Sequence, residues 1–81
     1  MDEETKKYIE ELERERDELA QKKRALEASF ATKEFKNLDK AERLDRRKQR
    51  ACMNGYLRHL DMRIVRARQE QQNKTTDEQK Q

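Results

Sequence analysis

Two tyrosines with nearby cations are the residues of this sequence best suited to chemistry, and that chemistry is nucleotide binding. Tyr8 adjoins Lys6 and Lys7, with Lys22 and Lys23 about four turns further on if the segment is helical. The second tyrosine, Tyr56, is followed by Arg58, Arg63, Arg66 and Arg68. A flat ring can stack on a base while nearby cations pair with a phosphate. The same residue types also fit tyrosines at an ordinary protein interface, and spacing alone leaves both interpretations open.

Catalytic and metal-binding constellations are missing from the sequence. His59 is the only histidine and stands alone as a candidate base, and Cys52 is the only cysteine. A single glycine, Gly55, cannot form a glycine-rich phosphate loop. We therefore expect a binding module that is not an enzyme and holds no metal or cofactor.

Composition predicts a small all-α protein that associates. The chain has 81 residues, of which 31% are hydrophobic and 48% charged, and it has no proline. A chain this short seldom buries enough apolar surface to be stable alone, so a homo-oligomer is expected. It has no signal-peptide pattern and no apolar run near the roughly 20 residues of a membrane span. We expect a cytoplasmic protein with no membrane partner.

Charge is distributed unevenly along the chain. Residues 1–42 carry a net charge of −3, residues 43–68 carry +7, and residues 69–81 carry −1. The cationic segment suits an anionic partner, but it also neutralises the acidic segment before it. Both interpretations remain open at this point.

A heptad of leucines predicts a long first helix over about residues 3–30. Leu12, Leu19 and Leu26 recur every seven residues, and Ile9 and Phe30 fall on the same seam. Two cations, Arg16 and Lys23, also occupy seam positions. Either their stems cover the seam while their charged ends reach water, or the cations face a bound anion.

The hairpin corner is expected between about residues 31 and 39. Phe35 and Leu38 would plug the end of the helix pair, and Asp39 with Glu42 has the spacing of a capping box that starts the next helix.

A second helix is predicted over about residues 40–70, followed by a disordered polar tail at 71–81. Its apolar stripe comprises Ala41, Leu44, Ala51, Met53, Tyr56, Leu57, Leu60, Ile64 and Ala67. Cys52, Met62 and Val65 lie off this stripe. The helix is therefore apolar over more of its circumference than a single partner helix can cover. Gly55, with Ala51 and Met62, marks a narrow face that we interpret as a subunit contact. The predicted fold is thus an antiparallel helical hairpin at 1–70, with room for a short helix at the N-terminus or corner.

The pattern of this hairpin resembles a family of small phage proteins. The positions that carry the resemblance lie between about residues 8 and 65: Leu19, Leu26, Phe35, Leu38, Leu44, Gln49, Met53, Tyr56, Leu60, Arg63 and Ile64. The family consists of helical hairpins, typically hexamers, that act as anti-defence sponges against CBASS and Thoeris immunity.

The resemblance implies a function and a set of binding residues. It implies capture, without cleavage, of cyclic dinucleotides, with cyclic trinucleotides or cyclic ADP-ribose isomers as further ligands, in the cytoplasm of the infected bacterial host. Tyr8, beside Lys7, would stack on a base at a site between subunits, and Lys22 or Lys23 would contact phosphate. Arg63 or Arg66 would serve a separate trinucleotide site.

A second class of function stays open beside the sponge. In this alternative, the basic hairpin binds an acidic protein or nucleic acid, for example as an inhibitor of a host defence protein. Nucleic acid is not the partner that the resemblance favours.

Overall fold

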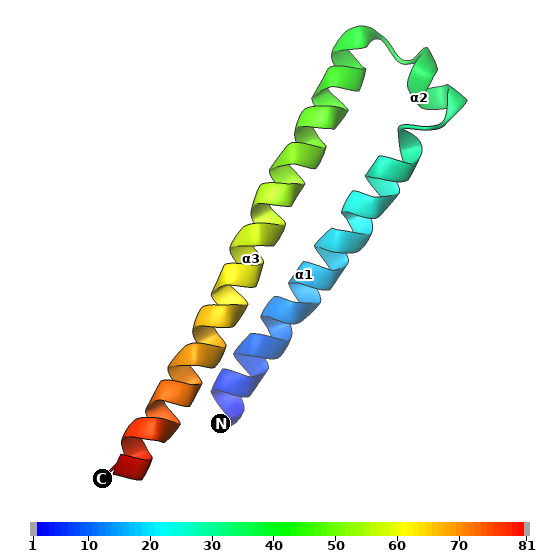
Figure 1. Cartoon of the computed structure of the whole chain (residues 1–81). Helices are drawn as coiled ribbons and strands as arrows, with labels where there is room; N and C mark the ends of the chain where they lie inside the picture. Colours follow the sequence, from blue (N-terminus) through cyan, green and yellow to red (C-terminus); the bar gives the residue numbers. More distant parts are fainter. Residues whose placement is uncertain (1, 81) are drawn as a thin grey trace.

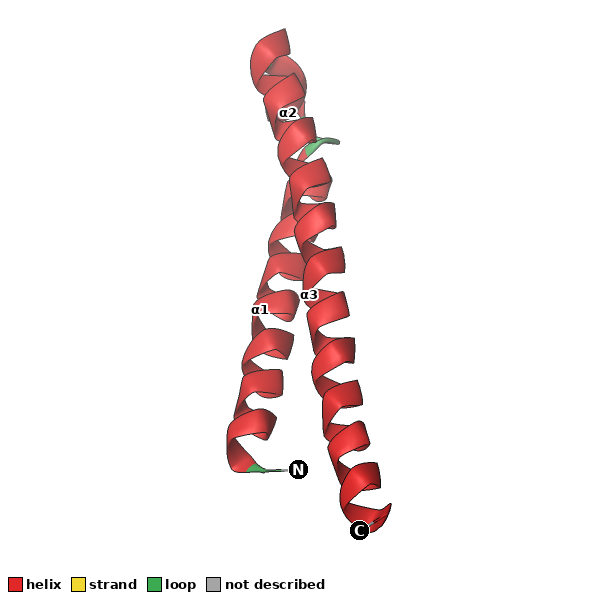
Figure 2. Ribbon diagram, turned by 90° about the vertical axis from the view of Figure 1, so that its left-hand side faces the viewer, coloured by secondary structure: helices red, strands yellow, loops and turns green. Residues whose placement is uncertain are grey.

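The structure, a computed structural model, is an all-α helical hairpin, as predicted. It describes residues 2–80, with side chains described as far as Gln71. The elements are α1 (Glu3–Ser29), α2 (Lys33–Asn37) and α3 (Lys40–Lys80). The long helices α1 and α3 run antiparallel side by side, and the short α2 forms the corner (Figure 1, Figure 2). The molecule measures 65 × 17 × 15 Å.

Each helix begins at a side chain that caps its first turn. The carboxylate of Asp2 accepts a hydrogen bond from the backbone N–H of Thr5 at 2.7 Å, and the Thr32 hydroxyl accepts one from Phe35 at 3.1 Å. At α3, Asp39 accepts from the backbone N–H of Glu42 at 2.8 Å. These bonds satisfy backbone donors that have no partner inside a helix. The capping role predicted for Asp39 is therefore confirmed.

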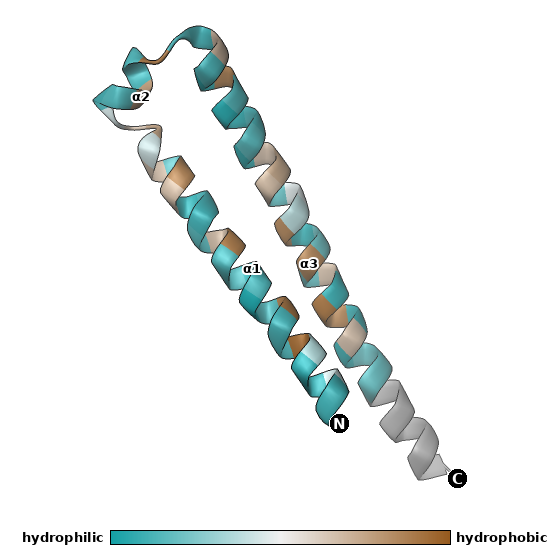
Figure 3. Cartoon of the chain, turned by 180° about the vertical axis from the view of Figure 1, so that it is seen from behind, coloured by the Kyte–Doolittle hydropathy of each residue, from teal (hydrophilic) through white to brown (hydrophobic). Residues whose placement is uncertain are grey.

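A narrow apolar seam joins α1 to α3. Leu12 packs with Leu60 and Ile64, and Leu19 extends this cluster. Ile9 and Ala67 are also buried nearer the open end of the hairpin. Hydrophilic residues cover most of both long helices, and apolar residues appear only in separate bands (Figure 3). The core is thus a single line of side chains between two helices.

Aromatic residues close the corner. Phe35 is buried, and its ring centroid lies 4.9 Å from that of Phe30. The guanidinium of Arg47, on α3, lies 5.8 Å from the Phe30 centroid and 5.6 Å from the Phe35 centroid, within cation–π range. The predicted plug is thus formed by Phe35, with Leu38 only half-buried.

Part of the apolar stripe predicted on the second helix was wrong. Leu60, Ile64 and Ala67 face α1, whereas Leu44 and Ala51 are exposed on the opposite side. Tyr56, four residues before Leu60, lies on the side toward α1 but is also exposed. Ala51 precedes Leu60 by nine residues, or two and a half helical turns, so the two side chains face opposite sides. The exposed residues Leu44, Ala51, Gly55, Met62 and Val65 lie on this outer side of α3, which we call the outer face.

The helix α3 continues past its predicted end near residue 70, through the segment expected to be a disordered tail, as far as Lys80. Residues 69–80 contain neither glycine nor proline and include several good helix formers, so nothing in the sequence stops the helix. The predicted domain boundary near residue 70 stays a prediction, since side chains from 72 onward lie outside the described part.

Between residues 2 and 80, no helix combines the length and the apolar content that a membrane crossing requires.

Replacing Leu60 by alanine tests the seam. Leu60 is fully buried, so Leu60→Ala should lower the free energy of unfolding by about 2–5 kcal/mol. Leu44→Ala is the matched control, since it removes the same atoms from a half-exposed site and should cost less than half as much. Urea denaturation at one fixed protein concentration measures both losses, and equal losses would contradict the assigned core.

Candidate functional site

Polar cross-helix contacts flank the apolar seam on both sides. On one flank, ion pairs join Arg16 to Asp61 and Glu13 to Arg68, and Arg50 Nε lies 2.8 Å from Glu27 Oε2. On the other flank, the Tyr56 hydroxyl donates to Glu15, and Arg63 Nη2 donates to the Tyr8 hydroxyl at 3.0 Å. We call these the ion-pair flank and the tyrosine flank.

Helical spacing explains the tyrosine flank. Tyr8 and Glu15 are seven residues apart on α1, as are Tyr56 and Arg63 on α3, so each pair lies on one side of its helix. In the antiparallel arrangement, Tyr8 meets Arg63 while Glu15 meets Tyr56. Each tyrosine therefore contacts a charged residue of the opposite helix.

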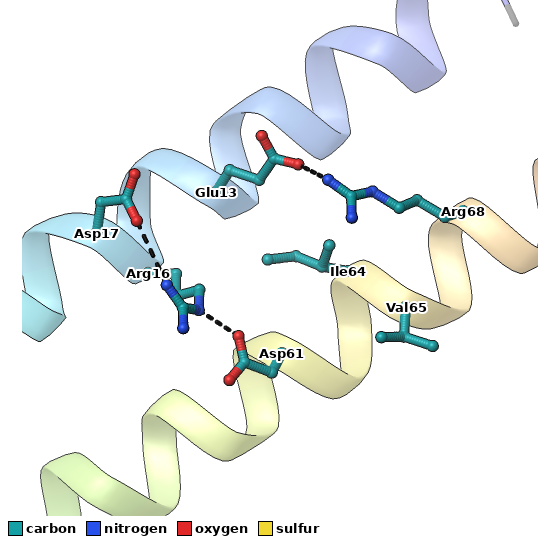
Figure 4. Close-up of a pocket in the computed structure, with 7 residues that line it drawn as sticks. All are labelled: Glu13, Arg16, Asp17, Asp61, Ile64, Val65 and Arg68. Atoms are coloured by element: carbon teal, nitrogen blue, oxygen red, sulfur yellow. Dashed lines mark hydrogen bonds and ion pairs between the residues drawn. The ribbon is translucent and has the colours of Figure 1, made fainter.

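The ion-pair flank has the larger recess of the two, about 520 Å³. Its lining includes three carboxylates and two guanidinium groups. Figure 4 shows these charged groups pointing toward one another, with Arg16 paired to Asp61 and Arg68 to Glu13. Since the two arginines are already paired and carboxylates are in excess, this recess does not suit an anionic ligand.

The recess on the tyrosine flank does suit an anion. It measures about 250 Å³ and is lined by Tyr8, Arg63, Arg66, Ala67 and Glu70. Two guanidinium groups here face one carboxylate, which leaves a positive excess. The Tyr8 ring is 43% exposed, so part of it remains available for contact with a ligand. We call this the Tyr8 recess, and it is the candidate site.

The Tyr8 side chain orders Arg63. The Arg63 guanidinium lies 6.0 Å from the Tyr8 ring centroid in addition to the hydrogen bond to the hydroxyl. That hydrogen bond is the main cause that raises the pKa of Arg63 above its ordinary value, and Glu15 and Tyr56 add to the rise. Arg63 thus stays charged and is held by a partner that bears no formal charge.

The structure brings together only some of the residues predicted from sequence. Tyr8, Arg63 and Arg66 line one recess, although the sequence resemblance assigned them to two separate sites. Lys7 is exposed next to Tyr8 but does not line the recess. Lys22 and Lys23 lie about 21 Å along α1 from Tyr8, too far to meet it within one chain.

The other cations singled out from the sequence lie away from the Tyr8 recess. Lys23 is half-buried, with Nζ 4.0 Å from Glu27 Oε1, and Lys22 is exposed. Arg16, the other cation on the predicted seam, reaches out to Asp61 instead of facing open solvent.

Sequence reasoning missed Glu15 and Glu70 near the candidate site. Only the seven-residue spacing of Tyr8 and Glu15 could have indicated the first of them.

Groups that could support catalysis are not assembled in the described part of the chain. His59 and Cys52 are both exposed, and neither side chain makes a hydrogen bond or an ion pair with the described residues. Among the residues searched there, no cluster of three or more histidine, cysteine or acidic side chains could hold a metal. What this geometry offers is an aromatic ring beside two guanidinium groups.

Comparison with known families gives one match. A family model described as Sequestin matches residues 6–66, which include most of α1, the corner and the stretch of α3 that carries Arg63 and Arg66. The corresponding comparisons with curated proteins and with solved structures gave no match.

Titration of Tyr56 tests the tyrosine flank. Its hydrogen bond to Glu15, aided by desolvation, raises the pKa of the Tyr56 phenol above 10.0. The stabilisation this gives the fold is present below pH 10 and is lost as the pH rises through the raised pKa. In a Tyr8→Phe background, where Tyr56 is the only tyrosine, Glu15→Gln should lower the pH at which phenolate absorbance appears. An unchanged titration curve would show that the hydrogen bond does not form in solution.

Proposed function

Because this chain belongs to the Sequestin family, whose members sequester a signalling molecule and are not enzymes, we infer that it captures an anionic, base-containing messenger at the Tyr8 recess. The observation that carries this proposal is the meeting of Tyr8, Arg63 and Arg66 in one recess. The ring can stack on a base, and the guanidinium groups can form charge-assisted hydrogen bonds to a phosphate.

Cyclic oligonucleotides are the messenger class that we propose. A cyclic dinucleotide presents two bases and two phosphodiester charges: the ring of the recess can stack on one base, and its two cations match the two charges. Cyclic trinucleotides or cyclic ADP-ribose isomers offer the same chemistry. In this proposal the protein is a phage sponge that lowers the free messenger of CBASS or Thoeris immunity in the cytoplasm of the infected host.

A homo-oligomer would complete the site. The recess of about 250 Å³ is smaller than typical ligand sites, which measure roughly 300–1,000 Å³. Arg66 also lines a neighbouring recess on the outer face, together with Met62 and Val65. A second copy packed on that face would border the Tyr8 recess. Lys22 and Lys23 would then contact the ligand from a neighbouring copy, in an assembly that we propose to be a hexamer.

The outer face itself supports a close subunit contact. Met62 and Val65 are more than half exposed, and a Cβ atom added at Gly55 would meet nothing within 4 Å in the single chain. The space beside Gly55 is thus open to a neighbouring helix.

Binding to an acidic protein or to nucleic acid is the second candidate, favoured by one surface near the corner. Lys40, Arg43 and Arg47 line a recess of about 220 Å³ with Leu44, and none of the three makes an ion pair in the described part of the chain. However, several other arginines of α3 already form ion pairs within the hairpin, namely Arg46, Arg50 and Arg68. The site with both an aromatic ring and cations therefore favours the messenger.

Ligand capture tests the proposal directly. Purified protein is incubated with cyclic dinucleotides, cyclic trinucleotides or cyclic ADP-ribose isomers, freed of unbound ligand and heat-denatured, and the released ligand is identified by mass spectrometry. We expect intact release of at least one messenger.

Variants of the proposed contacts sharpen this test. Tyr8→Ala, Arg63→Ala and Lys23→Ala should each abolish or strongly weaken capture. Arg14→Ala is the control and should not, because Arg14 is exposed and lies outside the recess. Recovery of every messenger in the free fraction would contradict the sponge, and steeply salt-sensitive nucleic-acid binding would instead support the second candidate.

Gly55→Leu tests the subunit contact. In one chain the new side chain meets open space, and replacing a helical glycine should stabilise the monomer by up to about 1 kcal/mol. If a second copy packs at Gly55, the same change should lower the mass of the assembly measured by light scattering toward the 9.9 kDa of a single chain. Arg14→Leu, on α1, controls for a new exposed leucine. An unchanged mass would show that Gly55 lies outside the subunit contact.

A further inference from the structure

Glu15 is the carboxylate that can compete with a ligand for Arg63. It lies on the tyrosine flank opposite Tyr56, whose hydroxyl donates to it, and its charge acts on Arg63. A direct Glu15–Arg63 ion pair would occupy the guanidinium that the candidate site offers to a phosphate. Glu70 is the acidic residue that lines the recess itself.

Arg63 and Glu15 nevertheless do not form an ion pair in the described structure. Arg63 donates to the uncharged hydroxyl of Tyr8 instead, at 3.0 Å. Glu15 accepts a hydrogen bond from Tyr56, which lies two helical turns before Arg63 along α3. The two partners that could neutralise each other are thus each bound to a tyrosine hydroxyl.

We propose that Tyr56 is a positioning residue for anion binding, because its hydroxyl holds the Glu15 carboxylate away from Arg63 and leaves that guanidinium available to the ligand phosphate. Tyr56 does not line the Tyr8 recess, so this role is indirect. The inference rests on the proposed function in that it names what keeps the same site open. It also assigns a role to the second tyrosine, which the proposed contacts do not use.

The size of the effect follows from the competing interaction. Exposed arginine–carboxylate pairs are weak, so release of Glu15 toward Arg63 should weaken anion binding by about two- to fivefold. The loss should depend on the Glu15 charge and should disappear when that charge is removed. Damage to the fold or loss of a direct ligand contact would lack this dependence.

Three variants test the role of Tyr56: Tyr56→Phe, Glu15→Gln and the double variant. Tyr56→Phe keeps the ring and removes the hydroxyl, and Glu15→Gln keeps the size and removes the charge. Two probes are titrated by calorimetry: 3′,3′-cyclic GMP–AMP, and pyrophosphate, which has no base. We expect weaker binding by Tyr56→Phe, wild-type or tighter binding by Glu15→Gln, and restored binding by the double variant, with unchanged assembly mass throughout.

The outcomes separate this inference from the proposed function. If Tyr56→Phe binds both probes as tightly as wild type, or if the double variant is not restored, Tyr56 does not act through Glu15. If the cyclic dinucleotide does not bind but pyrophosphate follows the expected order, the positioning role stands and this probe gives the sponge no support. If wild-type protein binds neither probe, the anion site is refuted, and the inference with it.

Discussion

The packing of Leu12 against Leu60 and Ile64 fixes the register between the two long helices, and every cross-helix contact depends on that register. A slip of α3 by one residue would turn its side chains by about 100° and separate Tyr8 from Arg63. Because the seam is one side chain wide, few apolar contacts set this alignment. The polar contacts on both flanks therefore help to set the alignment of α1 with α3.

The two flanks use charge in opposite ways. On the ion-pair flank, carboxylates and guanidinium groups neutralise each other, and the larger recess is left without a free cation for an anion. On the tyrosine flank, hydroxyls replace charged partners, so Arg63 is ordered without being neutralised by direct contact. An ordered but uncompensated guanidinium loses less conformational freedom when it binds a phosphate. This difference, more than recess size, distinguishes the candidate site.

Local patterns in the sequence were sufficient to predict the fold class but not the site geometry. The Asp39 cap, the Phe35 plug and the first-helix residues Ile9 and Leu12 all follow from neighbours in the sequence, and the structure confirms them. The resemblance to small phage proteins that sequester a signalling molecule, predicted over about residues 8–65, agrees with the Sequestin match over 6–66. By contrast, the contact between Tyr8 and Arg63 joins residues 55 positions apart. This contact depends on how the two long helices are aligned, and the sequence of either helix alone does not determine that alignment. The place of Leu44 on the buried stripe was wrongly predicted because a broadly apolar helix does not reveal which of its sides meets the partner.

The Tyr8 recess is lined by residues near the start of α1 and by the part of α3 that follows Arg63. Figure 1 shows the start of α1 at the end of the hairpin opposite the corner. At the corner the chain itself joins the helices, whereas at the open end only side chains hold the start of α1 against α3. The first turns of α1 are thus more prone to fraying than its turns next to the corner. A ligand that touches Tyr8 from α1 and Arg63 from α3 would bridge this open end, acting as a second, reversible closure. Its capture would then be coupled to the order of the N-terminal turns, and backbone amides there would exchange with solvent more slowly while the ligand stays bound.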